Sequence, residues 1–162
     1  MERKTKIDAE AGKQDLVITR EFDLPLELLF RATVEPEIVE QWMGTRVLKM
    51  ESKKFGAYQF ETKNAEGKVV FKANGVIHEF IPNQKITRTF EMENAPFAVQ
   101  LEFMEFEKLT EDTSKISIHS IYKSAALRDQ VLRFGFASGI NMAHDRLQEI
   151  AGKLKQHHEK AE

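Results

Sequence analysis

The sequence predicts one α+β domain in which a long C-terminal helix crosses the concave face of a curved antiparallel sheet of about seven strands. Three observations support this fold class. One strand-like segment precedes two short amphipathic segments, six segments then alternate apolar and polar residues, and a long helical pattern ends the chain. We assign residues 15–154 to the domain and predict that the polar, aperiodic residues 1–14 and 155–162 are flexible.

The first three predicted elements are a strand and two short helices. Residues 15–22 alternate apolar and polar side chains and include β-branched residues, which is typical of a strand. Pro25 suits a first helical turn, and apolar residues at three- and four-residue steps predict a helix over residues 26–34. A second short helix, set at an angle because proline interrupts the first, covers residues 35–43 and ends at Gly44.

Six further strands are predicted because the apolar period changes to two after the second helix. Short turn-forming stretches separate these strands, as in antiparallel hairpins, so consecutive strands should lie side by side in a meander. The predicted strands cover residues 46–50, 57–63, 68–80, 85–92, 97–108 and 115–122.

The last predicted element is a helix over residues 125–154. Its apolar residues, among them Phe136 and Ile140, form one stripe that faces the sheet. Glycine weakens a helix interior, so Gly135 and Gly139 indicate close packing, a kink or room left for a ligand. Where such a helix does not close completely on a concave sheet, a lined cavity remains.

Composition excludes several classes of function. Lys plus Arg number 24 against 26 Asp plus Glu, and the interspersed charges, with a net charge of -2, give no basic face for nucleic acid. No run is long and apolar enough to insert into a membrane, and the charged N-terminus does not resemble a secretory signal. The chain has no cysteine, so disulfides and thiolate sites are excluded. These features predict a cytoplasmic protein.

The order of elements resembles the helix-grip fold of the START-like, or Bet v 1-like, superfamily. Four stretches narrow the resemblance to the family named after the activator of Hsp90 ATPase, called AHSA1-like: Arg20–Gly44, Phe55–Phe60, Asn74–Phe90 and Gly139–Ile150. The chain departs from the family pattern where members commonly carry a Trp pair with Gly-Pro, a Gly-Gly, and a Gly-Trp in the last helix. Because these departures lie around the predicted mouth of the cavity and the gripping helix, they concern the ligand and not the fold.

Alternation assigns one face of three predicted strands to the inside: residues 86, 88 and 90, residues 97, 99, 101 and 103, and residues 116, 118, 120 and 122. The predicted ligand-binding residues are aromatic, Met and polar side chains expected between sheet and helix. They are Trp42, Met50, Tyr58, Phe60, Phe71, Arg88, Phe90, Phe103, Ser120, Tyr122, Phe136 and Ile140. Ordinary core packing is the alternative for each aromatic residue. Arg88 either anchors a ligand carboxylate, or reaches the rim or pairs with an acid such as Glu79 or Glu105.

The sequence predicts no metal site, no cofactor and no catalytic residue. His78, His119 and His144 lie on different elements without metal-ligand spacing, and nucleophile elbows, phosphate loops and dinucleotide fingerprints are absent from the sequence. Four acids are candidate general acids or bases only if one is buried beside the cavity, and solvent exposure is the alternative for each: Glu79, Glu102, Glu105 and Asp145.

These observations favour binding or carriage of a small hydrophobic molecule in a cavity between sheet and helix, without its transformation. Two other functions stay open. The resemblance also implies a chaperone-associated, Hsp90 ATPase activator-like interaction module, and the superfamily includes cyclases and hydrolases. An exposed apolar surface outside the cavity would favour the interaction module, and a strongly perturbed acid or base inside it would favour an enzyme.

Overall fold

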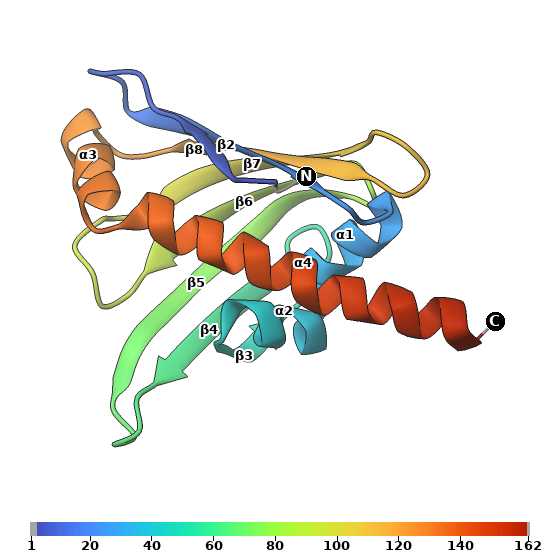
Figure 1. Cartoon of the computed structure of the whole chain (residues 1–162). Helices are drawn as coiled ribbons and strands as arrows, with labels where there is room; N and C mark the ends of the chain where they lie inside the picture. Colours follow the sequence, from blue (N-terminus) through green and yellow to red (C-terminus); the bar gives the residue numbers. More distant parts are fainter. Residues whose placement is uncertain (1–2, 162) are drawn as a thin grey trace.

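The computed structural model describes the backbone of residues 3–161 and the side chains of residues 3–156. The described residues form four helices and one eight-stranded sheet, and the sheet curves around the long helix α4 (Figure 1). The elements are β1 (Lys6–Asp8), β2 (Asp15–Phe22), α1 (Leu26–Val34), α2 (Pro36–Met43), β3 (Arg46–Met50), β4 (Ala57–Lys63), β5 (Val69–Ile81), β6 (Lys85–Met92), β7 (Gln100–Lys108), β8 (Ser114–Ile121), α3 (Ala125–Arg133) and α4 (Phe136–Ala161).

The sheet has the order β1-β2-β8-β7-β6-β5-β4-β3, and every neighbouring pair is antiparallel. Strands β3 to β8 are consecutive neighbours because short turns join them. The first long strand, β2, returns to pair with the last, β8. This arrangement confirms the predicted α+β helix-grip class.

Regular structure extends into both terminal segments that were predicted to lie outside the domain. Within residues 1–14, β1 pairs with the edge of β2, with Ile7 opposite Ile18. A strand of three residues is too short to show periodicity. Within residues 155–162, α4 continues to Ala161. Residues 1–2 and 162 of these segments lie outside the described residues.

The predicted helix over residues 125–154 is wrong at one point, because it is two helices. Helix α3 begins at the N-cap Ser124, whose hydroxyl oxygen accepts a hydrogen bond from Leu127 N at 3.1 Å. It ends at Arg133, and Gly135 then adopts φ 75°, a left-handed conformation that glycine reaches without strain. Helix α4 starts immediately afterwards with a new direction (Figure 1).

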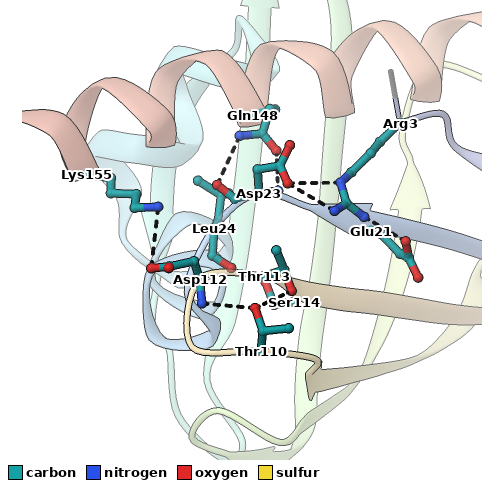
Figure 2. A network of polar contacts seen from close by, with 10 residues as sticks. All are labelled: Arg3, Glu21, Asp23, Leu24, Thr110, Asp112, Thr113, Ser114, Gln148 and Lys155. Atoms are coloured by element: carbon teal, nitrogen blue, oxygen red, sulfur yellow. Dashed lines mark hydrogen bonds and ion pairs between the residues drawn. The ribbon is translucent and has the colours of Figure 1, made fainter. Parts of the chain in front are cut away.

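The part of α4 from Leu147 to Lys155 is fixed to the body of the protein. Leu147 and Ala151 are buried in the hydrophobic core beneath the helix. Figure 2 shows the polar contacts at this end: Asp23 N, in the turn after β2, donates to Gln148 Oε1 at 2.8 Å. Lys155 Nζ lies 3.7 Å from Asp112 Oδ1 in the turn after β7. Two turns at one end of the sheet therefore hold this part of the helix.

Candidate ligand-binding cavity

A cavity of about 440 Å³ lies between the concave face of the sheet and the first half of α4. This volume is in the range of pockets that enclose small organic molecules. Its wall is mostly apolar and includes Ile18 of β2, Phe90 of β6 and Met104 of β7, with Ile140 of α4 opposite them. Phe134 also lines the cavity and is 77% exposed, so the cavity meets the surface at the junction of α3 and α4.

Most of the predicted ligand-binding residues line this cavity. They are Trp42, Met50, Phe60, Arg88, Phe90, Ser120, Phe136 and Ile140. Trp42 has a second contact, because its indole Nε1–H donates to Ala32 O at 2.7 Å and so joins α2 to α1. The residue is both part of the wall and a support for the helix that carries it.

Tyr58, Phe71, Phe103 and Tyr122 are outside the lining. Tyr58 and Tyr122 are buried in the core, and Phe71 packs against the core from the side. Phe103 was expected to face inward, but it lies on the outer face of the sheet, 37% exposed, with its ring centroid 6.1 Å from that of His119.

The predicted inward face of β7 is wrong, because it is shifted by one residue along the strand. The lining residues of this strand are Gln100, Glu102 and Met104, so the polar side chains that alternation assigned to solvent face the cavity. A shift of one residue exchanges the two faces of a strand. The preceding loop contains Ala98 at φ 62°, a conformation that apolar alternation does not reveal. The pairing register with β6, in which Arg88 lies opposite Glu102, supplies the missing information.

Arg88, Glu102 and Ser120 form a row across three neighbouring strands. Glu102 is the register partner of Arg88 on one side and of Ser120 on the other. Arg88 Nε donates to Glu102 Oε1 at 2.9 Å, and Gln100 Nε2 donates to Glu102 Oε2 at 2.9 Å. The acid that pairs with Arg88 is therefore Glu102 and neither Glu79 nor Glu105.

Tyr58 packs against the Arg88 end of this row. The guanidinium Cζ of Arg88 lies 4.8 Å from the centroid of the Tyr58 ring, a cation–π contact. The Tyr58 hydroxyl donates to the backbone oxygen of Thr89. Burial raises the pKa of Tyr58, with Arg88 opposing the shift, so the phenol stays protonated. Gly75 makes this packing possible, because any Cβ there would collide with the Tyr58 ring and Thr89 O.

His144 of α4 lines the opposite wall and is 3% exposed. Its Nδ1 shares a hydrogen bond of 2.7 Å with Thr5 Oγ1, and its ring meets that of Phe22 edge-on at 5.6 Å. Burial lowers the pKa of His144 to about 4, and the positive charge of Arg20 acts in the same direction, whereas Asp145 opposes it. The imidazole is therefore neutral at neutral pH and a weak general base there.

The charges on the cavity wall balance. The ionisable lining residues are Arg88, Glu102 and His144: one cation, one anion and one neutral imidazole. Within the part of the chain that the structure describes, no group of three His, Asp or Glu side chains is placed to hold a metal ion. The cavity is thus an apolar chamber with one charge-balanced polar row.

Comparison with known proteins identifies the family of the chain. Residues 23–152 match the family described as activator of Hsp90 ATPase homolog 1-like protein. The chain belongs to that family. No curated protein matches this AHSA1-like chain in sequence.

Solved bacterial structures share the fold of this AHSA1-like protein. A protein from Rhodobacter sphaeroides superposes with a TM-score of 0.80 at 17% identity, covering 91% of this chain and 99% of that one. A protein from Mycobacterium smegmatis has a TM-score of 0.79 at 17% identity, covering 91% of this chain and 96% of that one. A protein from Nitrosomonas europaea has a TM-score of 0.74 at 19% identity, covering 91% of this chain and 99% of that one. Identities this low show the fold alone. None of the described helices is long and apolar enough to cross a membrane.

Proposed function

We propose that this AHSA1-like protein binds or carries a small hydrophobic molecule in the cavity between the sheet and α4, without transforming it. The observation that carries the proposal is a cavity of about 440 Å³ whose wall is mostly apolar, with one charge-balanced row on the sheet and the neutral His144 opposite it. Burial of apolar ligand surface supplies the affinity, at about 25 cal/mol per Å² before the losses of ordering. The polar row fixes orientation.

The single tryptophan provides the assay. Trp42 is the only Trp of the chain and lines the cavity, so its fluorescence should report occupancy directly. We expect saturable changes in fluorescence with members of a panel of apolar compounds. Backbone amide shifts in ¹⁵N-labelled protein should map to β6, β7 and the first half of α4.

A matched pair of variants locates the binding. Ala143→Phe adds a ring on the cavity side of α4 and should abolish binding or weaken it at least about tenfold, because it occupies ligand volume. Ala137→Phe adds the same ring at an exposed position of the same helix and should leave affinity unchanged. If no compound in the panel binds, or if both variants bind as well as the natural chain, the proposal is wrong.

The family description supplies a second candidate, an Hsp90 ATPase activator-like interaction module. Exposed apolar side chains outside the cavity favour it. Phe55, in the turn between β3 and β4, is 70% exposed, and Met142 and Val70 are 63% and 50% exposed; none of the three lines the cavity. A partner surface of standard size buries about 800 Å² on each protein, and these three side chains lie on different elements, so we place ligand binding first. Stimulation of Hsp90 ATPase activity that Phe55→Ser removes would reverse this order.

A further inference from the structure

The polar row indicates which class of ligand the cavity takes, an inference that rests on the proposed function. Arg88 and Glu102 are 17% and 13% exposed, and both lie on central strands of the sheet. Arg88 rests on Tyr58, and Gln100 holds the second oxygen of Glu102. Neither side chain can leave the wall without breaking several contacts, so a ligand meets the pair as a preformed unit.

Hydrogen-bonding capacity remains on both members of the pair. Within the described residues, Arg88 donates only through Nε, and its Nη atoms are not among the fully buried polar atoms that lack a partner. They are therefore accessible from the cavity that Arg88 lines. Each oxygen of Glu102 accepts one bond and has room for a second. The row thus offers N–H donors beside carboxylate acceptors.

Charge balance decides between charged and uncharged ligands. A ligand carboxylate bound to Arg88 would share that cation with Glu102 and leave one net negative charge in an apolar chamber. A ligand ammonium bound to Glu102 would leave one net positive charge beside Arg88. His144 supplies no compensating charge, because it is neutral at neutral pH. Burying an uncompensated charge is costly, so both classes are disfavoured.

We propose that the ligand is an uncharged molecule with an apolar body and one polar end, in which a carbonyl oxygen lies beside an N–H or O–H group. The carbonyl oxygen accepts from the Nη atoms of Arg88, and the adjacent N–H or O–H donates to Glu102. A carboxamide is the simplest group of this kind. The first half of α4 covers the apolar body.

Three probes with one common body test this inference. A naphthyl-butanamide, the matching naphthyl-butanoate and the matching naphthyl-butylamine share the apolar body and differ at the polar end. At pH 7 the amide is neutral, the acid is an anion, and the amine, which lacks the carbonyl group, is a cation. Titrated at pH 7 against Trp42 fluorescence and by calorimetry, the amide should bind at least about tenfold more tightly than the acid or the amine. Tightest binding of the acid or the amine, or equal binding of all three, would overturn the inference and leave the proposed function standing. Failure of all three would count against both.

A charge change should reverse the selectivity. Glu102→Gln keeps the shape of the side chain and leaves Arg88 as an unpaired cation, so the acid should become the preferred probe. Glu105→Gln removes the same charge at an exposed position of the same strand and should keep the preference for the amide. An unchanged order of affinities in a folded Glu102→Gln protein would refute recognition by the pair. The comparison of the three probes on the natural chain needs no variant and stands if Glu102→Gln does not fold.

Discussion

Buried His144 should make the protein less stable as the pH falls from 7 to 4. The ordinary histidine pKa of 6.5 applies to the unfolded chain, whereas the folded protein holds His144 at about 4. Above pH 6.5 both states are neutral at this residue and its contribution is fully present. Between 6.5 and 4 only the unfolded state binds the proton, so stability falls with falling pH. Below 4 both states bind it and the loss ends.

The size of this effect follows from the two pKa values. At about 1.4 kcal/mol for each pH unit between them, the loss is about 3 kcal/mol. That is a large part of the 5–15 kcal/mol that holds a typical domain folded. Side-chain carboxylates also titrate in this range, so the contribution of His144 must be separated from theirs.

Urea denaturation at a series of pH values, with and without His144, makes that separation. His144→Gln keeps a polar group facing Thr5 but carries no titrating proton. The natural chain should lose about 3 kcal/mol more than this variant between pH 7 and 4, because carboxylate effects cancel in the difference. His78→Gln, at an exposed position, should follow the natural chain. A difference in stability between the natural chain and His144→Gln that stays constant with pH would show that His144 does not cause the loss.

Two further predictions concern the packing under the cavity and the attachment of α4. Gly75→Ala should lower the free energy of unfolding by about 3 kcal/mol, because the new methyl group collides with the Tyr58 ring. In contrast, the methyl group of Gly139→Ala meets open space in a helix, so this variant should raise the free energy of unfolding by up to about 1 kcal/mol. Thermal denaturation of both variants tests this contrast, and equal effects would contradict it. Gln148→Ala should destabilise by about 1 kcal/mol through loss of its bonds to Asp23, measured by urea denaturation, with no change in affinity for an apolar probe.

The fold was predictable because its signals are local. A change of apolar period from helix-like to two, together with short turns, determines a meander of antiparallel strands, and an apolar stripe then requires a helix to cover the sheet. A kink at Gly135 was one of three interpretations left open, and the sequence could not choose it, because glycine inside a helical pattern is equally compatible with tight packing. Its left-handed φ depends on the tertiary structure around it.

The cavity was predictable only in part, because alternation gives the two faces of a strand but not which of them points inward. On β6 and β8 the choice of the apolar face was correct, and Phe90 and Ile118 line the cavity. On β7 the same choice placed Phe103 inside and Glu102 outside, the reverse of the structure. Choosing the apolar face of a strand as its inward face gives the wrong answer where a polar pair lies in an otherwise apolar cavity wall. Residues that violate the rule are therefore the ones to examine for function.

The proposed role in ligand recognition accounts for the Arg88–Glu102 pair better than a contribution to stability does. A partly buried ion pair gives little net stability, since removing two charges from water offsets their attraction, and apolar residues of similar size often fold as well or better. Two parts of α4 separate the two requirements. Leu147, at the end of the cavity, and Ala151 bury the part of the helix from Leu147 onward, and Gln148 ties this part to the turn after β2. The part between Gly135 and Leu147 faces the cavity and the polar row, where packing is incomplete. The Arg88–Glu102 pair lies where packing contributes least to stability, and its remaining hydrogen-bond donors and acceptors are available there to a ligand.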